Sequence, residues 1–413
     1  MVALQGRGPA ISEFGDEQLS ATKPRLLIVT SHPIQYQVPW FRALHADGRL
    51  DLQVLFLSLP DAHQQGTGFG HAFQWDVPLL DGYSWLQAPS AKGGLHDGWW
   101  GLSLAAAAND ISAHAPDVVL VCGWQKRGML QCLLAARKLG LPVLLRAESN
   151  GLGPSGALRS LKNRWIARHA DQLLPIGKAN RAFYERLGLA ARIGPDVAYF
   201  VDNGFFSSRS AGRITGSADV RSKFGVPEAA CCFLFAGKLE PKKRPQDLLA
   251  ALESVQRSSA NPVHLLIVGS GPLEAQLRSR VEASRLPVTF AGFLNQTEMP
   301  GAYAAADCLV LPSDYGETWG LVVNEAMACG IPAIVSDRVG CGPDLVHQAE
   351  TGFQFKFGDI DGLAESMLAF IALTSAQRHE MGSRARQLVL DKYSIKAAVE
   401  GTTRAVLEVS RVS

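Results

Sequence analysis

Residues 308–332 read CLVLPSDYGETWGLVVNEAMACGIP. The apolar run Cys308–Leu311 is followed by a polar loop and by a helical pattern over Gly320–Cys329, which Gly330 and Pro332 end. A short apolar strand that leads through a loop into a helix is the repeating unit of a doubly wound α/β sheet. Ligands bind such sheets at the carboxyl ends of the strands, where this loop is expected to lie.

Similar strand-like runs occur on both sides of this segment. The first half has them at Arg25–Thr30, Leu52–Leu57, Asp117–Cys122, Pro142–Arg146 and Gln172–Pro175. The second half has them at Cys232–Ala236, His264–Val268, Val288–Phe290, Cys308–Leu311 and Ala333–Ser336. Helical patterns separate them, at Gly128–Leu139, Pro245–Gln256, Pro272–Ala283 and Thr297–Ala305. Continuous apolar runs are typical of parallel strands covered on both faces, so we expect two Rossmann-like α/β domains.

The chain length also favours two domains, because 413 residues exceed what one hydrophobic core usually supports. Asn203–Gly204 is interpreted as a structural turn, and SSRSAGRITGSADV (207–220) as an exposed connection. Helical composition returns from Ser375, with a break at Tyr393–Ser394. The predicted divisions are a leader at 1–22, a first domain at 23–205, a second domain at 206–390, and a last helix at 391–413 that packs back on the first domain.

Composition restricts the class of protein. The 47% hydrophobic and 19% charged residues are typical of a globular domain. Lys and Arg (40) nearly balance Asp and Glu (38), which argues against a nucleic-acid partner. No run reaches the ~18 apolar residues of a spanning helix, and the start has no signal-peptide pattern, so we expect a cytoplasmic protein. The seven cysteines are expected to be reduced and buried, and none has metal-ligand spacing.

The loop and helix start in the opening segment are suited to an anion. The N–H groups of Gly320, Leu321 and Val322 would point out of the helix start, where they favour a diphosphate. Glu325, inside the helix, offers a carboxylate for ribose hydroxyls, and Glu317 lies in the loop at the strand's end. The alternative is that both are capping or surface glutamates.

Two lysines follow the strand Cys232–Ala236, within FAGKLEPKKRP (235–245). Lys238 and Lys243 would stabilise charge on a departing diphosphate. The alternative is a solvated basic loop, which Lys242 and Arg244 fit better.

A glycine turn, VGSGP (268–272), follows the next strand. Gly269 and Gly271 shape a nucleotide pocket without identifying the nucleotide, since a lone turn of this form is a weak signal. Phe293 and Leu294, after the strand Val288–Phe290, are placed to hold a base through backbone groups.

These motifs, in this order, resemble the donor domain of glycosyltransferase family 4, whose members are retaining enzymes of the GT-B fold. The family's pattern of Glu, seven residues and Glu falls on Glu317 and Glu325, and its glycine and lysine loop falls on Gly237, Lys238 and Lys243. The likeness covers most of residues 231–370. It implies two Rossmann-like domains that face a central cleft.

The resemblance also implies roles. Glu325 would bind the donor ribose, Glu317 the hydroxyls of the transferred sugar, and Lys238 and Lys243 the diphosphate. Lys238 stands where the family commonly has arginine. The lysine keeps the positive charge but lacks the planar, bidentate fork of the guanidinium group. The remaining implied donor contacts are Gly237, Gly269, Gly271, Phe293, Leu294, Thr318, Trp319, Gly320, Leu321 and Val322. No metal or other cofactor is implied, since Asp359-Ile-Asp361 is interpreted as a helix cap.

The first domain matches more loosely, although TSHPIQYQVPWF (30–41) resembles the opening of certain bacterial members. His32 would bind acceptor or donor phosphate at the cleft; alternatively it is a loop histidine fixed by Pro33. Arg146 and Glu148 end another strand at the same edge, either as acceptor-side groups or as partners of each other. His32 and Glu148 join Glu317, Lys243 and Lys238 as candidate catalytic residues.

The function implied is transfer of a hexose-type sugar from a nucleoside-diphosphate sugar to a hydroxyl acceptor, in envelope polysaccharide or glycolipid assembly. The alternatives are an epimerase or phosphorylase, a small-metabolite glycosyltransferase, a hydrolase that uses Glu317 and Glu325, and a non-catalytic nucleotide-sugar-binding protein. The basic residues of 157–170 are interpreted either as a peripheral membrane contact or as a solvated helix face. Trp99–Trp100 would stack on a sugar or lipid, or fill a core or a loop.

Overall fold

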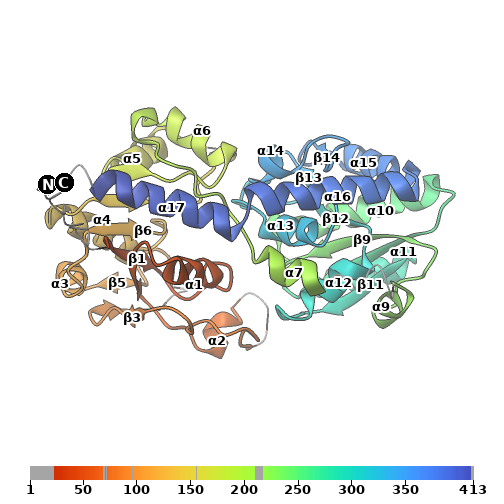
Figure 1. Ribbon diagram of the computed structural model, residues 1–413. Helices are drawn as coiled ribbons and strands as arrows, with labels where there is room; N and C mark the ends of the chain where they lie inside the picture. The colour runs from red at the N-terminus through yellow and green to blue at the C-terminus, as the bar shows by residue number, and fades with distance from the viewer. Residues whose placement is uncertain are drawn as a thin grey trace, which may run out of the picture.

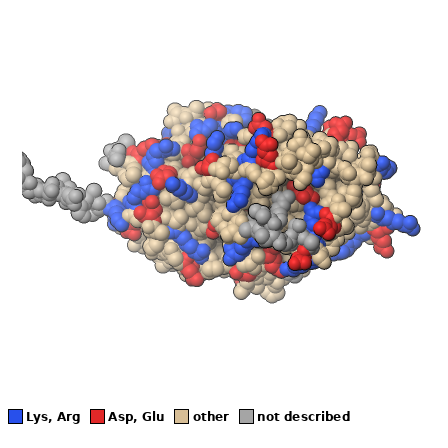
Figure 2. Space-filling view, turned by 45° about the vertical axis from the view of Figure 1, so that its right-hand side comes forward, with Lys and Arg blue, Asp and Glu red and all other residues tan. Residues whose placement is uncertain are grey.

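The computed structural model describes residues 23–67, 70, 72–94, 97–154, 156–209 and 217–410. The predicted leader, 1–22, lies outside them. Two six-stranded sheets, each flanked by helices, lie side by side along the long axis of the molecule (Figure 1). Basic and acidic side chains are interspersed on the face in Figure 2, as the small net charge leads us to expect.

The first sheet is parallel throughout and has the order β3-β2-β1-β6-β7-β8. Its strands are β1 (Arg25–Thr30), β2 (Asp51–Phe56), β3 (Trp85–Gln87), β6 (Val118–Val121), β7 (Val143–Leu145) and β8 (Gln172–Leu173). Its helices are α1 (Val38–Asp47), α2 (Ala62–Gln65), α3 (Ala107–Ser112), α4 (Arg127–Lys138), α5 (Ala157–Ala167), α6 (Lys178–Arg186) and η1 (Ala190–Arg192). The edge strand β3 was not predicted, because its residues are mostly exposed. The short pair β4 (Ala91–Lys92) and β5 (Ser103–Leu104) was not predicted either.

The second sheet repeats this design with the order β11-β10-β9-β12-β13-β14. Its strands are β9 (Cys231–Ala236), β10 (Val263–Val268), β11 (Val288–Gly292), β12 (Cys308–Leu311), β13 (Ala333–Ser336) and β14 (Gly352–Phe355). Its helices are η2 (Pro241–Lys243), α10 (Pro245–Ser258), α11 (Glu274–Ser284), α12 (Met299–Ala305), α13 (Leu321–Ala328), α14 (Gly342–Leu345) and α15 (Ile360–Ala372). Among the strands of this sheet only β14 was not predicted, since glycine and glutamine interrupt its apolar run; the short helices η2 and α14 were not predicted either. Asp359 caps α15 by accepting the N–H of Gly362 at 2.9 Å, as predicted for this residue.

Each sheet separates two apolar cores. Along β1, Leu27 and Val29 pack on the side of α4 and α6, whereas Leu26 and Ile28 pack on the side of α1. This alternation explains why the strand is apolar at every position, because both of its faces are covered. The cysteines are free thiols, and all except the half-buried Cys122 are buried, as predicted.

The connection between the domains is more helical than the sequence suggested. Residues read as a turn and an exposed loop instead form part of α7 (Asn203–Arg209) and α9 (Ser217–Lys223), with 210–216 outside the described residues. The Asn203 side-chain amide donates to the carbonyls of Val389 and Tyr393. Phe206 is buried in the apolar core of the second domain. This packing stabilises α7 although its serines have a weak preference for helix.

The chain ends with α16 (Ser375–Lys392), which packs on the second domain, and α17 (Ile395–Ser410), which lies across the first (Figure 1). Ala398, Val399 and Val406 of α17 share a core with Trp40 and Phe41 of α1. The chain therefore crosses between the domains a second time. No helix among the described residues is long and apolar enough to cross a membrane.

Candidate active site

Two neighbouring pockets lie between the domains, at the carboxyl ends of β9, β10 and β12. The first, which we call the glycine pocket, is about 100 Å³ and is lined by Tyr36, Trp75, Ala236, Gly237, Val268, Gly269, Phe293, Leu294, Gln296, Met299, Val322 and Glu325. The second, the carboxylate pocket, is about 240 Å³ and is lined by Tyr36, Glu148, Tyr199, Lys243, Glu317, Thr318, Trp319, Gly320, Leu321 and Val322. Tyr36 and Val322 line both pockets, which therefore adjoin.

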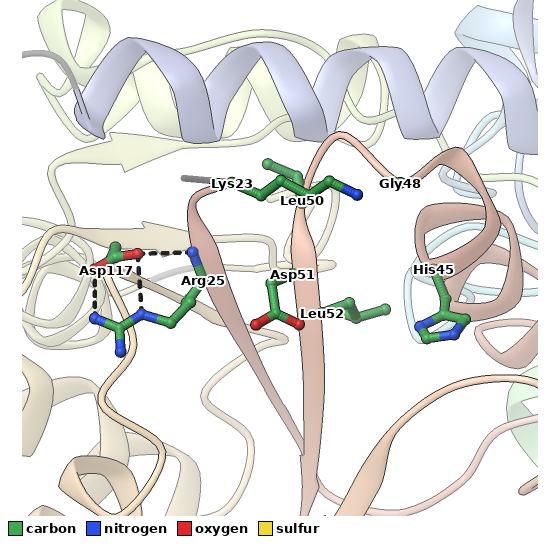
Figure 3. Close-up of a pocket in the computed structure, with 8 residues that line it drawn as sticks. All are labelled: Lys23, Arg25, His45, Gly48, Leu50, Asp51, Leu52 and Asp117. Carbon is green, nitrogen blue, oxygen red and sulfur yellow. Dashed lines mark hydrogen bonds and ion pairs between the residues drawn. The ribbon is translucent and has the colours of Figure 1, made fainter. Parts of the chain in front are cut away.

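A third pocket, about 690 Å³, lies at the opposite, amino ends of β1, β2 and β6 (Figure 3). Arg25 lies at one side of it and pairs with Asp117, its guanidinium at 2.9 Å and its backbone N–H at 2.8 Å from the carboxylate. Parallel α/β sheets bind ligands at the carboxyl ends of their strands, so this pocket is on the wrong side for the motifs.

Glu325 lies in α13 and is 2% exposed. Its carboxylate accepts hydrogen bonds from Tyr303, at 2.5 Å, and from Tyr36 of the first domain. Burial raises the pKa of Glu325 to about 7, although the two phenols act in the opposite direction. A carboxylate held in this way at a pocket wall accepts hydroxyl donors, and Tyr36 now takes one of its acceptor positions.

Glu317 and Lys243 form an ion pair in the carboxylate pocket. Their side chains are only 15% and 13% exposed, so the pair is largely removed from solvent. Ser313 donates a further hydrogen bond to Glu317 at 3.3 Å. The structure thus brings together the predicted lysine, Lys243, and the predicted loop carboxylate, Glu317. The ammonium group of Lys243 lines the pocket and can bind an anion there.

The start of α13 requires glycine. Gly320 caps the helix with φ of 101°, in the left-handed region, and a Cβ there would lie 3.0 Å from Leu311 and 3.1 Å from Val339. Gly269 has φ of 127°, and a Cβ there would lie 2.0 Å from the carbonyl oxygen of Gly237. These glycines let the backbone of two loops approach each other beside the pockets, and Gly271 lies against the backbone of Leu239 in the same turn.

Lys238 is directed differently from Lys243. Its ammonium donates to the carbonyl of Thr67 in the first domain at 2.8 Å, and burial lowers its pKa. Lys238 therefore joins the two domains beside the glycine turn, and only Lys243 of the two predicted lysines lies beside Glu317.

Glu148, beyond the end of β7, reaches the carboxylate pocket. It accepts hydrogen bonds from Tyr199 and, at 3.1 Å, from Thr318 of the second domain. One interpretation of the sequence paired Glu148 with Arg146. In the structure Glu148 instead binds Tyr199 and Thr318. The contact with Thr318 holds Glu148 beside the loop that carries Glu317.

Arg146 was predicted on the acceptor side but lies in the interior of the first domain, 3% exposed. Its guanidinium packs over the rings of Trp40, Tyr199 and Phe200, and its Nε donates to the carbonyl of Val197 at 3.2 Å. Arg146 directly follows β7, and its side chain packs on the face covered by α1, whereas Glu148, two residues later, reaches the carboxylate pocket.

His32 lies in the loop after β1, and its Nδ1 is 2.9 Å from the hydroxyl of Ser31. It is half-buried. Both interpretations of His32, as a ligand of acceptor or phosphate and as a fixed loop residue, are compatible with this position.

Further polar contacts close the domains together around the pockets. Asn150 donates to the carbonyl of Thr318 at 3.0 Å, and Asp344 accepts the N–H of Lys178 at 3.0 Å. On the other side of the cleft, the amide of Asn295 donates to the carbonyl of Gln74 at 2.7 Å. The loops that line the pockets are thus held from both domains.

Residues 217–388 match the family model described as glycosyl transferases group 1. The match covers most of the second domain. The matched curated relatives include D-inositol 3-phosphate glycosyltransferase of Thermomonospora curvata, 32% identical over 219 residues and 50% of each chain. They also include N-acetyl-alpha-D-glucosaminyl L-malate synthase of Bacillus anthracis, 29% identical over 42% of this chain and 44% of the relative. The chain spans about half the length of these relatives, or less.

Solved structures extend the likeness of fold to the whole chain. Sucrose-phosphate synthase from Thermosynechococcus elongatus has a TM-score of 0.71 at 17% identity and covers 94% of this chain and 100% of its own. The Anabaena protein HepE, solved in complex with UDP and glucose, has a TM-score of 0.67 at 16% identity over 93% of this chain and 100% of its own. With its two parallel six-stranded sheets, the chain has the GT-B fold.

The sequence analysis assigned no role to Tyr36, Tyr303 or Asn324. Tyr36 and Tyr303 bind Glu325, and Asn324 accepts from the Trp319 indole at 2.7 Å. Tyr36 lies within the stretch 30–41, which was noted for its resemblance to certain bacterial family members, but no role was assigned to this tyrosine. The tyrosine of α12 and the buried asparagine beside Glu325 carried no distinguishing pattern.

Proposed function

We propose that this chain is a retaining glycosyltransferase that moves a hexose-type sugar from a nucleoside-diphosphate sugar to a hydroxyl acceptor. The observation that carries the proposal is the carboxylate pocket, in which the Glu317–Lys243 pair lies beside the amino end of α13. A cation and free helix-start amides favour a diphosphate there, and a carboxylate accepts sugar hydroxyls.

In this proposal the two adjoining pockets bind different parts of the nucleotide sugar. The glycine pocket, with Phe293, Leu294 and Gly269, would take the base and ribose, with the ribose hydroxyls on Glu325. The diphosphate would then pass Val322 and Gly320 into the carboxylate pocket, where the sugar meets Glu317 and Glu148. In this arrangement the ribose takes the acceptor position on Glu325 that Tyr36 now uses.

The chemical step requires stabilisation of the leaving diphosphate more than a protein nucleophile. As the bond from the sugar's anomeric carbon to the diphosphate breaks, negative charge grows on phosphate oxygens, where Lys243 and the α13 amides would hold it. The acceptor hydroxyl would attack the face that the diphosphate leaves and pass its proton to a donor phosphate oxygen. Glu317 would orient the sugar, and Lys238 would support the loop.

The comparisons support the donor class. The matched curated proteins are named as glycosyltransferases and synthases of sugar conjugates, and HepE was solved with UDP and with UDP-glucose. For this chain we propose a nucleoside-diphosphate sugar as donor, metal-independent transfer, and work at the cytoplasmic side of an envelope polysaccharide or glycolipid pathway, with peripheral contact to the membrane.

The hydrolase alternative is weaker. A retaining hydrolase needs one carboxyl group as acid and the other as nucleophile, both facing the scissile bond. Here Glu317 is paired with Lys243, and Glu325 is enclosed by two tyrosines in the wall of the other pocket. An epimerase, a phosphorylase or a non-catalytic binding protein would also use the nucleotide contacts, so turnover has to be measured.

The test is release of nucleoside diphosphate from UDP-, GDP- and ADP-sugars, with a membrane-lipid extract and sugar acceptors present. Wild type is expected to release diphosphate only when an acceptor fraction is added, with the anomeric configuration of the donor kept in the product. Glu317→Gln should lose this release and keep nucleotide binding. Binding without transfer to any acceptor fraction would favour the binding protein, and an inverted anomer would exclude the retaining reaction.

A further inference from the structure

Large apolar side chains are exposed along one face of α5 in the first domain. Leu158 is 85% exposed, Leu161 is 62% and Trp165 is 40%. Their spacing of three and then four residues places them on one side of the helix. Ile166 and Ala167 are the residues of α5 that are buried against the domain. A helix of a globular protein normally turns such a stripe inwards, so its exposure requires a partner.

Two tryptophans extend this apolar surface. Trp100 is 69% exposed and stacks edge-on against Trp99, with ring centroids 4.6 Å apart. The ammonium of Lys162, on α5, lies 5.4 Å from the Trp99 ring, which joins the tryptophan loop to the helix. Trp100 therefore lies in an exposed loop and not in a core. We call Leu158, Leu161, Trp165, Trp99 and Trp100 the apolar stripe.

Cations surround the apolar stripe. Arg159, Lys162 and Arg168 are exposed on α5 and at its end, and the sequence from 156 to 170 contains no acidic residue. At the other edge, Arg127 lies 5.3 Å from the Trp100 ring, and Lys126 donates to the carbonyl of Gly98 at 2.9 Å. Arg164 is directed away, since it donates to the carbonyl of Leu187 at 2.6 Å. The partner of this surface should therefore be apolar and negatively charged.

We propose that the apolar stripe and its basic border are a docking surface for a bilayer that contains anionic lipids. Leucine and tryptophan side chains enter the boundary between headgroups and acyl chains, while lysine and arginine bind the phosphates. A second copy of this chain would place the same cations opposite each other, which opposes self-association. A helix that lies flat with leucines and tryptophan on one side and cations at its borders fits a bilayer plane.

The docking surface continues into the cleft. The loop residues 146–154 lead from Glu148, in the carboxylate pocket, towards the start of α5. Along this loop the carbonyl of Leu152 accepts from Arg338 at 2.6 Å, and Gly153 packs against the half-exposed ring of Tyr315. A lipid in the docked bilayer would thus present its headgroup near the entrance to the pocket. This step rests on the proposed function and makes the acceptor a lipid-linked hydroxyl.

The experiment is flotation of the full chain with vesicles of phosphatidylcholine, with or without phosphatidylglycerol. Wild type is expected to float with the anionic vesicles, to be left behind by the neutral ones, and to be released by high salt. Leu158→Ser with Leu161→Ser should lower the bound fraction at least about tenfold, because two leucines lose their burial in lipid. Lys162→Glu with Arg168→Glu should lower it to a similar extent.

The matched control is Leu86→Ser with Leu139→Ser, two leucines of the first domain that are 43% and 40% exposed outside the stripe. This control should float like wild type. The proposal would be overturned if wild type bound no vesicles, if it bound neutral and anionic vesicles equally, or if Leu158→Ser with Leu161→Ser floated as well as wild type. A finding that the stripe instead joins two copies of the chain would also overturn it. Stabilisation of the stripe variant by nucleotide, measured in parallel, keeps a failure of docking separate from a failure of the donor site.

Discussion

The phenol of Tyr36, in the first domain, hydrogen-bonds the carboxylate of Glu325, in the second. Tyr36 follows β1, whereas Glu325 lies in α13, so this contact joins the two domains at the point where the glycine and carboxylate pockets meet. If Glu325 binds the donor ribose, the Tyr36 hydroxyl competes with that ribose in the unliganded protein. Donor binding would then exchange one hydroxyl for another.

Tyr36→Phe removes this competitor and keeps the ring. We expect nucleoside diphosphate to bind several-fold more tightly, up to about tenfold, since a net hydrogen bond contributes about 1 kcal/mol. Titration calorimetry of wild type and variant measures the difference. Weaker binding by the variant would mean that the phenol contacts the nucleotide itself.

Glu325 should make stability depend on pH. Its pKa of about 7 in the folded protein lies above its ordinary value of 4.5, so between these values the folded state holds more protons than the unfolded state. The contribution of Glu325 to stability is therefore greatest below pH 4.5 and is lost as pH rises through 7. Glu325→Gln has no such proton to lose.

Thermal unfolding of wild type and Glu325→Gln at pH 5 and pH 8 measures this effect. The variant should gain stability relative to wild type on going to pH 8, by up to about 3 kcal/mol. A difference in melting temperature that is the same at both pH values would show that Glu325 does not titrate in this range.

Lys243→Ala should weaken binding of a nucleoside diphosphate far more than that of the monophosphate, because the proposed function places the outer phosphate beside Lys243. A charge-assisted hydrogen bond contributes about 1.5–3 kcal/mol, so roughly a tenfold to hundredfold loss is expected with the diphosphate. Competition binding with both nucleotides measures this ratio. Lys243→Ala also leaves Glu317 without its cation, so folding has to be checked.

Lys242→Ala is the matched control for Lys243→Ala. Lys242 is the preceding residue, is 47% exposed and pairs with Glu240 at 3.2 Å. It should change neither affinity by more than about twofold, as surface ion pairs contribute little. Similar losses in both variants, or equal losses for both nucleotides, would contradict a specific diphosphate contact at Lys243.

Glu317→Gln and Glu325→Gln should separate turnover from nucleotide binding. We expect Glu317→Gln to lower kcat by tenfold or more with a small change in UDP or GDP affinity, because the proposed function assigns the transferred sugar to Glu317. Glu325→Gln should weaken the free nucleotide and the nucleotide sugar alike. Initial rates and nucleotide titrations on the two variants decide this, and equal losses of nucleotide affinity would refute the division of roles.

The strands and helices of the second domain were largely predictable, because β9 to β13 are apolar at nearly every position and each is followed by a loop and a helical pattern. The sequence placed Lys243 and Glu317 after the strands β9 and β12, which are neighbours in the sheet, but it did not predict their ion pair. Strands, helices and the residues at strand ends can thus be predicted from the local sequence alone.

The contributions of the first domain were not predictable in the same way. Whether Arg146 or Glu148 faces the cleft depends on where β7 ends and how the chain turns afterwards. Tyr36 reaches Glu325 only because the two domains approach each other. The exposure of Leu158, Leu161 and Trp165 likewise could not be read from spacing, because the same spacing usually marks the buried face of a helix.

The most direct measurement of the central claim is thermal stability of the purified chain with UDP, GDP, ADP and CMP and their common sugar conjugates, in the presence of EDTA. A ligand that binds only the folded state raises the unfolding temperature. The account predicts stabilisation by one class of nucleoside diphosphate and its sugars, lost in Glu325→Ala and retained in Leu158→Ser. No shift with any nucleotide would contradict a preformed, metal-independent donor site between these domains.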